Sequence, residues 1–308
     1  MNRPIRTLLT AFLLSAAVFL PPSTRAEQPP EAPFSVAWLS DTQAMIAYDD
    51  LRHRLNAQSD WLNEHAESEN IRLILHTGDV TDNPWVPAQV RLAEEFFAAL
   101  PKGIPALAVA GNHDLGVKKK RYEKWTEFSF VRDNPHARRY RDGEGVSTLP
   151  EAGGRKLLFV GLGFGNRNDE AYVWAREMFN AHPDATGVFF SHAYIDTLGD
   201  TLQEGRYFDK FLLPYCPNLR LVLCGHSRDT AHTVRRFTDE ATGSERTVDI
   251  VMSNFQGNTA GYGALRLLRF APAENRLVID GVLPAPDATE RERDKVRRAA
   301  ISLEGFFS

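Results

Sequence analysis

Five short apolar runs, each followed at once by polar residues that can bind metal or carry protons, constrain this 308-residue sequence more than any other feature. Between the first runs lie two stretches with helical spacing. One begins near Asp49 and places Leu51, Leu55 and Leu62 on one face, and the other covers 87–100. Strand and helix alternate at a spacing that favours right-handed crossover units around a largely buried sheet. The sequence therefore predicts an α/β fold.

The residues that follow these runs form the candidate site. In a sheet built from crossover units the carboxyl ends of the strands lie together, where ligands bind, so we expect these side chains to converge. Asp carboxylates, an Asn carbonyl and neutral His nitrogens suit Mn, Fe, Zn or Mg better than a soft metal. The runs and the residues after them are 34–40 with Asp41-Thr42-Gln43, 71–77 with Gly78-Asp79, 106–110 with Gly111-Asn112-His113-Asp114, 187–191 with His192, and 219–224 with Gly225-His226.

This series resembles the five ordered motifs of the calcineurin-like metallophosphoesterases, whose first motif reads Asp-x-His or, in some branches, Asp-x-Gln. The resemblance runs from about residue 34 to residue 228, and the opening 38–43 is similar to bacterial secreted members. It implies a four-layer α/β/β/α sandwich of two mixed sheets, packed face to face, with flanking helices. It also implies an enzyme, a metallophosphoesterase that hydrolyses phosphomonoesters or phosphodiesters.

The resemblance further implies a role for each motif residue. A hydroxide between two divalent metal ions would attack phosphorus, since paired ions supply a nucleophile at neutral pH. His113 would protonate the leaving oxygen, with Asp114 orienting its ring; a helix cap or turn role for Asp114 is an equal alternative. The implied metal ligands are Asp79 as the bridge, Asp41 and Gln43 at one site, and Asn112, His192 and His226 at the other.

The last motif departs from the family pattern. Most members end it as Gly-His-x-His, whereas residues 225–228 read Gly-His-Ser-Arg. Arg228 offers only hydrogen-bond donors and stays protonated, so it cannot replace the missing histidine ligand. Gln43 is also a weaker ligand than histidine. The site at Asp41 and Gln43 is therefore depleted, and one or two metal ions remain possible.

Three interpretations of this depleted site stay open. Asp229 or His232 supplies the missing ligand from the same loop, or one ion binds tightly and the other is labile. Alternatively, the protein is a catalytically degraded, metal-binding envelope protein that binds a phosphorylated ligand or serves a structural role. Arg228 itself is a candidate substrate-binding residue, because a guanidinium can grip two phosphoryl oxygens.

The start of the chain has the layout of a secretory signal. A basic beginning, an apolar run over 8–20 and a small-residue ending predict a signal peptide over 1–26, hence a periplasmic or secreted protein. The apolar run is shorter than the ~20 residues needed to span a bilayer, so no stable membrane span is expected after cleavage. We expect a linker over 27–33, the metallophosphoesterase domain over 34–285, and a charged tail over 286–308 that is a surface helix or disordered.

Charge and cysteine content narrow the partners. The chain has 36 basic and 40 acidic residues, and signal cleavage would remove three arginines and no acid. Nucleic-acid capture depends on neutralising phosphates with Lys and Arg, so a small phosphorylated substrate is favoured over nucleic acid, and a nuclease of the same superfamily is disfavoured. Cys216 and Cys224 are separated by too much extended chain for a disulfide, which predicts two buried free thiols.

Overall fold

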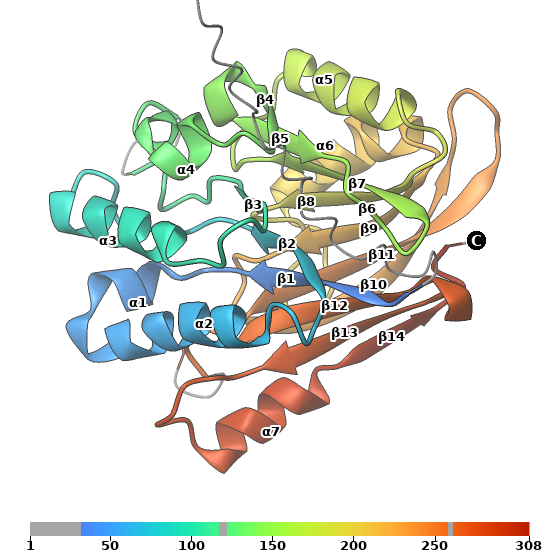
Figure 1. Cartoon of the computed structure of the whole chain (residues 1–308). Coiled ribbons are helices and arrows are strands. Elements are labelled where there is room, and N and C mark those ends of the chain that lie inside the picture. Colours follow the sequence, from blue (N-terminus) through green and yellow to red (C-terminus); the bar gives the residue numbers. More distant parts are fainter. Residues whose placement is uncertain (1–31, 117–121, 258–260, 308) are drawn as a thin grey trace, which may run out of the picture.

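The computed structural model describes residues 32–116, 122–257 and 261–307, and contains two mixed β-sheets (Figure 1). The first sheet has six strands in the order β14-β13-β12-β1-β2-β3. Its parallel part, β1 to β3, comes from the first two crossover units, and its antiparallel part comes from the end of the chain. The strands are β1 (Phe34–Leu39), β2 (Ile71–His76), β3 (Ala106–Ala108), β12 (Leu265–Ala271), β13 (Arg276–Val282) and β14 (Ile301–Glu304).

The second sheet has eight strands in the order β10-β11-β9-β8-β7-β5-β4, and β6 pairs with β7 beside this path. Its centre, from β7 to β9, is parallel, as is the pairing of β11 with β9. The strands are β4 (Arg138–Tyr140), β5 (Gly145–Thr148), β6 (Glu151–Ala152), β7 (Arg155–Leu162), β8 (Thr186–Ser191), β9 (Leu219–Cys224), β10 (Asp229–Thr238) and β11 (Glu245–Asn254).

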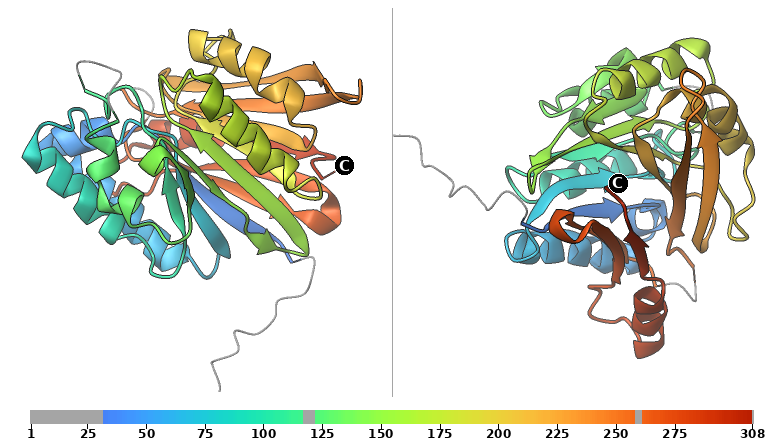
Figure 2. Two further views of the ribbon diagram at one scale, coloured as in Figure 1. Left: turned by 90° about the horizontal axis from the view of Figure 1, so that it is seen from above. Right: turned by 90° about the vertical axis from the view of Figure 1, so that its right-hand side faces the viewer.

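Helices cover the outer faces of both sheets (Figures 1 and 2). On the six-stranded sheet these are α1 (Gln43–Ala47), α2 (Arg52–His65), α3 (Pro87–Ala98) and α4 (Ser129–Arg132), whose apolar side chains share one core with that sheet. On the eight-stranded sheet they are α5 (Asp169–Asn180) and α6 (Gln203–Phe211). Short 3-10 helices lie at Asp49–Leu51, Trp125–Glu127, Arg141–Gly143, Leu213–Tyr215 and Pro272–Glu274.

A core between the two sheets completes the four layers. Side chains alternate along a strand, so β1 sends Val36 and Trp38 into the inter-sheet core and Ala37 and Leu39 toward the helices. Being buried on both faces explains why β1 is a continuous apolar run. The expected four-layer fold of two mixed sheets with flanking helices is confirmed.

The charged end of the chain contains the expected surface helix and, in addition, a strand that we did not expect. It forms α7 (Glu290–Arg298) and then β14, which pairs antiparallel with β13 and extends the six-stranded sheet. Leu303 and Phe306 are buried against the inter-sheet core, so this segment has apolar anchors despite its charge. Although β11 and β12 are consecutive in the chain, β11 lies in the eight-stranded sheet and β12 in the six-stranded one.

Two further expectations concern the termini and the thiols. The signal segment 1–26 and most of the linker 27–33 lie outside the described residues. None of the helices within the described part of the chain is both long and apolar enough to cross a bilayer. Cys216 and Cys224 are buried free thiols, as predicted, and burial raises the pKa of Cys216 far above its usual range.

Candidate metal centre

Three candidate ligands sit on strained backbone at the carboxyl ends of their strands. Asp41, Asp79 and His226 adopt positive φ angles of 54°, 54° and 71°. Non-glycine residues in this left-handed region cost about 1–3 kcal/mol each and persist only where the surroundings fix them, which is common at functional sites. The strain turns each side chain sharply away from its strand direction.

Glycines beside these ligands make the close approach possible. A Cβ on Gly111 would overlap the carboxylate and backbone of Asp79, and a Cβ on Gly225 would overlap the carboxylate of Asp41. The motif glycines therefore have two functions. They allow the chain to turn, and they leave room for the loops from different strands to touch each other.

Four of the predicted ligands meet at one point. Nε2 of His192 lies 3.1 Å from Oδ1 of Asn112, 3.1 Å from Nδ1 of His226 and 3.3 Å from Oδ2 of Asp79. The Nδ1 atom of His192 lies 3.0 Å from the carbonyl oxygen of Thr77, which can only accept, so Nδ1 carries a proton and donates. This contact aims Nε2 at the other three atoms, as in metal-binding histidines whose second nitrogen is held by a carbonyl.

The charges in this cluster favour a cation at its centre. Burial alone would lower the pKa of His192, but the charge and hydrogen bond of Asp79, together with the Asp41 charge and the Thr77 hydrogen bond, raise it to about 9. Burial raises the pKa of Asp79, yet the charge and hydrogen bond of His192 hold it below the ordinary value. In the absence of a metal, the proton on His192 therefore supplies the positive charge that a divalent ion would bring. The donor set of carboxylate, amide oxygen and imidazoles fits Mn, Fe, Zn or Mg.

Asp41 lies next to this cluster with an unsatisfied oxygen. Its Oδ2 accepts from the Ser40 hydroxyl and, at 3.2 Å, from the His226 backbone N–H. Its Oδ1 is buried and has no hydrogen-bond partner among the residues that the structure describes. Burial raises the pKa of Asp41 to about 7 despite the nearby His192, and Asp79 adds to the increase. A buried, unpaired carboxylate oxygen beside other ligands indicates room for a cation.

Comparison with known proteins agrees with this geometry. The family model described as calcineurin-like phosphoesterase matches residues 34–227, more than half of the chain. The chain belongs to the calcineurin-like phosphoesterase family. Metal-dependent phosphoester hydrolysis is the general chemistry of that family, and the resemblance noted from the motifs is confirmed.

Individual relatives add the fold but no substrate. The Bacillus subtilis (strain 168) protein YvnB, described as uncharacterized, is 27% identical over 258 residues. The match covers 82% of this chain and 20% of YvnB, so the chain spans about a fifth of that relative. The structure of purple acid phosphatase PPD1 from yellow lupin (Lupinus luteus) seeds aligns at a TM-score of 0.56 and 9% identity, over 90% of this chain and 55% of that chain, which shows a shared fold. The structure of TT1561 of Thermus thermophilus aligns at a TM-score of 0.41 and 14% identity, over 89% of this chain and all of that one, a score too low to support a conclusion.

The candidate acid, His113, lies at the rim of the centre. The backbone N–H of His113 donates to Oδ1 of Asp79 at 2.9 Å, and its side chain is 41% exposed. Its Nδ1 lies 3.0 Å from Oδ1 of Asp82. The structure describes no hydrogen bond to its Nε2, so this atom is open to a ligand.

Asp114 takes the turn role that was the alternative to orienting the His113 ring. Its buried carboxylate accepts from the backbone N–H groups of Val80, Thr81 and Gly111 at 2.8–3.1 Å, and from the Thr81 hydroxyl. Burial, followed by repulsion from Asp79, raises the pKa of Asp114 to about 6. Asp114 thus ties the second and third motif loops together, and Asp82 takes the position beside the ring. Sequence reasoning missed Asp82 because no motif spacing marks it.

The depleted side of the centre is arranged differently from the family pattern. Gln43 donates its amide Nε2 to Oδ2 of Asp79 at 3.0 Å, although we expected it to present an oxygen to a metal. Arg228 is exposed. Asp229 is bound to Lys295 at 2.9 Å, and His232 to Asp249 at 2.7 Å, so neither candidate replacement faces the centre.

Two residues that the sequence did not single out complete the surroundings. Gln256, just after β11, donates Nε2 to the backbone oxygen of Asp41 at 2.5 Å and to Oε1 of Gln43. The ring of Phe164 packs on His192 and His226, each at 5.9 Å between ring centroids, and shields one side of the cluster. Neither residue belongs to a motif, and only the nearness of Gln256 to the glycine-rich 257–263 segment offered a signal.

Proposed function

We propose that this protein hydrolyses phosphate esters of a small substrate at the centre formed by Asp79, Asn112, His192 and His226. The observation that carries the proposal is the convergence of these four side chains on His192 Nε2, with His113 at the rim. A divalent ion bound there polarises phosphoryl oxygens and provides a nucleophile at neutral pH.

The chain's own residues then have distinct tasks. The Thr77 carbonyl accepts a hydrogen bond from Nδ1 of His192 and so keeps the proton on Nδ1. When a cation takes the place of the second proton, Nε2 is free to bind it. Asp79 accepts a hydrogen bond from the backbone N–H of His113, which keeps the position of the proposed acid constant relative to the cation site. His113 Nε2 delivers a proton to the leaving oxygen, while Asp82 stabilises the protonated ring from Nδ1.

A direct test is hydrolysis of 4-nitrophenyl phosphate, and of bis(4-nitrophenyl) phosphate, by the purified chain from residue 27. The metal-free protein should be inactive and regain turnover with one of Mn²⁺, Fe²⁺, Zn²⁺ or Mg²⁺. The ratio of the two rates separates monoesterase from diesterase activity. A protein that binds metal but hydrolyses neither ester with any of these ions would support the alternative of a noncatalytic phosphate-binding protein.

We also propose that the protein is exported to the periplasm or outside the cell, on the strength of the basic, apolar and small-residue pattern over 1–26. Expression of the full chain with its native start should give a product that begins at residue 27 in the exported fraction. A product that retains the first residues and stays in the cytoplasm would contradict the proposal.

A further inference from the structure

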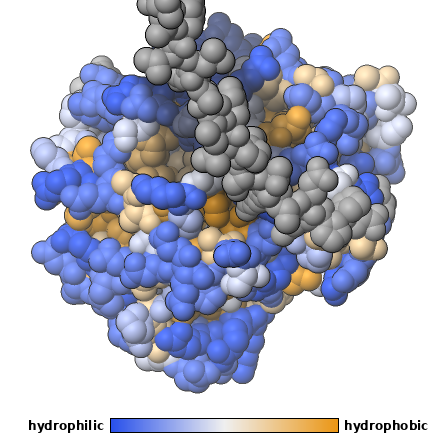
Figure 3. Space-filling model, in the orientation of Figure 1, coloured by the Kyte–Doolittle hydropathy of each residue, from blue (hydrophilic) through white to orange (hydrophobic). Residues whose placement is uncertain are grey.

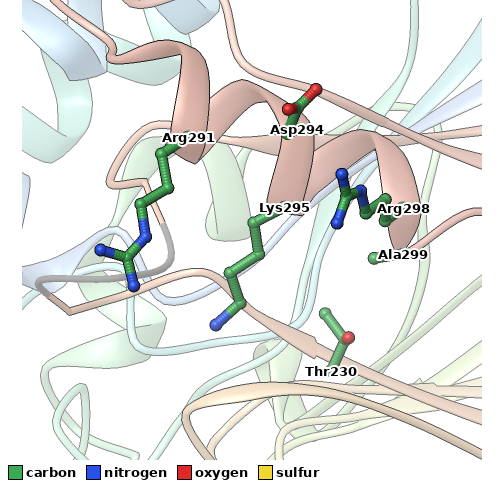
Figure 4. A pocket seen from close by; sticks show the side chains of 6 residues that line it. All are labelled: Thr230, Arg291, Asp294, Lys295, Arg298 and Ala299. Carbon is green, nitrogen blue, oxygen red and sulfur yellow. The ribbon is translucent and has the colours of Figure 1, made fainter.

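A basic hollow lies between α7 and the start of β10 (Figure 4). Its volume is about 630 Å³. Arg291 and Lys295 extend from the helix across the hollow, and Thr230 stands on the strand side (Figure 4). The surface over α7 is hydrophilic in the space-filling view (Figure 3). The lining residues are Thr230, Arg291, Asp294, Lys295, Arg298 and Ala299.

The helix presents its cations on one face. Arg291, Lys295 and Arg298 are spaced by four and three residues, so they project from the same side of α7. The helix start is fixed by a capping box between Thr289 and Glu292, which sets the rotation of that face.

Two of the three cations are not neutralised. Lys295 is the neutralised one, because it is paired with Asp229. The carboxylate of Asp294, which also lines the hollow, is paired with Arg297 and not with one of the three lining cations. In the part of the chain that the structure describes, Arg291 and Arg298 form no ion pair. Two guanidinium groups without an ion pair favour an anion in this hollow, and each of them can bind a phosphate with two parallel hydrogen bonds.

The hollow is joined to the metal centre through β10. Lys295 binds Asp229, which follows His226 by three residues, and Asn254 holds the His226 carbonyl at 3.1 Å while it faces Asp229 in the strand pairing. Residues 226–228 form a bend with positive φ at His226 and Asp229, and three residues span at most ~11 Å even when extended, so the backbones of His226 and Asp229 lie closer together than that. A ligand whose phosphoryl group lies at the centre can therefore extend a second group toward the hollow.

We propose that this hollow binds a second acidic group of the substrate, so that the enzyme selects small molecules with two anionic groups joined by a spacer that reaches from the metal centre to the hollow. The proposal rests on the proposed hydrolysis at the metal centre. The chemistry required of the second group is that of a phosphate or carboxylate, and the guanidinium pair favours phosphate.

Alkanediol bisphosphates of increasing chain length, compared with the matching monophosphates, test this idea. The parent should prefer a bisphosphate of suitable length by at least ~10-fold in kcat/KM, since charge-assisted hydrogen bonds are worth about 1.5–3 kcal/mol. The double variant Arg291→Ala with Arg298→Ala should lose this preference and keep its rate on the monophosphate. Arg206→Ala, which removes an exposed cation on α6, is the matched control and should change neither rate.

Equal rates on both esters at every chain length, or an undiminished preference in the double variant, would overturn the proposal. Calorimetry separates this outcome from failure of the proposed function. If the parent hydrolyses no ester yet binds a bisphosphate in a manner that depends on Arg291 and Arg298, the hollow is an anion site and the hydrolysis proposal fails.

A separate observation concerns the amides beside Asp41. The carbonyl oxygen of Asp41 can only accept, so the Gln256 atom that contacts it must be the Nε2 donor. The same Nε2 contacts Gln43, which must therefore present its oxygen to Gln256. Its NH₂ group is then directed at Oδ2 of Asp79. A main-chain carbonyl thus fixes the orientation of both amides.

We infer that this relay makes Gln43 a hydrogen-bond donor to Asp79 instead of a metal ligand, and that Gln256 is the positioning residue that holds it so. Among the described side chains that we considered as ligands, the Asp41 side then offers a cation the oxygens of Asp41 and Asp79, since Arg228 is an exposed donor and Asp229 and His232 are paired with other residues. The protein should hold one divalent ion tightly and a second one weakly.

Equilibrium dialysis of the metal-free protein against Mn²⁺ tests the relay without reference to activity. We expect one tight ion per chain in the parent. Gln256→Ala frees Gln43 to turn its oxygen inward, and Gln43→His supplies an imidazole, so each should tighten the second ion by about tenfold or more, as ~1.4 kcal/mol corresponds to tenfold. Gln203→Ala, at an exposed position of α6, is the control. Two equally tight ions in the parent, or weaker second binding in Gln256→Ala, would overturn the inference.

Discussion

Replacing the two partners of the rim contact, His113 and Asp82, should give effects of very different size. His113→Ala removes the proposed acid, and general acid catalysis contributes ~10²- to 10⁴-fold to turnover. Asp82→Asn removes only the carboxylate beside Nδ1. That pair is 3.0 Å long, but its side chains are 41% and 48% exposed, and ion pairs of such exposure contribute about 0.2–1 kcal/mol. The expected loss for Asp82→Asn is therefore only about 1.4- to fivefold.

The assay is kcat/KM on a series of aryl phosphates with leaving groups of different basicity, together with metal content. In His113→Ala the loss should shrink as the leaving group improves, because good leaving groups need less protonation, and the bound metal should stay unchanged. Asp82→Asn should show the same trend at reduced amplitude. Equal losses for all leaving groups, loss of metal in His113→Ala, or a loss in Asp82→Asn as large as that in His113→Ala would refute the assigned roles.

Three further predictions follow from the centre. Asp79→Ala should remove tight metal and activity together, measured by metal analysis and ester hydrolysis, since Asp79 contacts both His192 and the amide of Gln43; full metal content would contradict its role. Gly111→Ala should destabilise the fold and displace the metal, because the added Cβ overlaps Asp79, and its midpoint of denaturant unfolding should be lower than that of the parent. The control is Gly243→Ala, whose Cβ meets no neighbouring atom, so that its loss of stability comes from the positive φ alone. In the metal-free protein the pKa of His192 is about 9, above its ordinary value of 6.5, so the stability that its protonation provides is complete below pH 6.5 and is lost as the pH rises through 9. The urea midpoint of the parent should therefore fall over this pH range more steeply than the midpoint of His192→Gln. The affinity for metal should rise over the same range, because the ion displaces the proton.

The sequence was sufficient for the features that depend on strand ends. The convergence of four ligands could be predicted, because crossover connections place the carboxyl ends of parallel strands at one edge. These ligands are Asp79, Asn112, His192 and His226. The layering could be expected from the family resemblance, and the long apolar runs agree with strands that are buried on both faces.

Features that depend on loop geometry could not be foreseen. Positive φ at Asp79 and the tight approach of Gly111 turn Asp114 toward the backbone and leave Asp82 beside His113, and no spacing rule encodes that turn. Gln256 reaches Asp41 from a distant loop for the same reason. The strand β14 was missed because it has only four residues and follows a long charged stretch, and its place is set by contacts with β13.

The ligands of the centre come from both sheets, and this division links cation binding to the mechanics of the whole fold. Asp79 and Asn112 follow strands of the six-stranded sheet, whereas His192 and His226 follow strands of the eight-stranded one. A bound ion therefore cross-links the two sheets at one end of the sandwich. Saturation at 100 times the dissociation constant adds about 2.7 kcal/mol against any opening that separates the sheets. Amide hydrogen exchange at the loop end of β2 and β8 should slow on metal addition, while exchange in the hairpin of β10 and β11 far from that end, near 237–246, should stay unchanged.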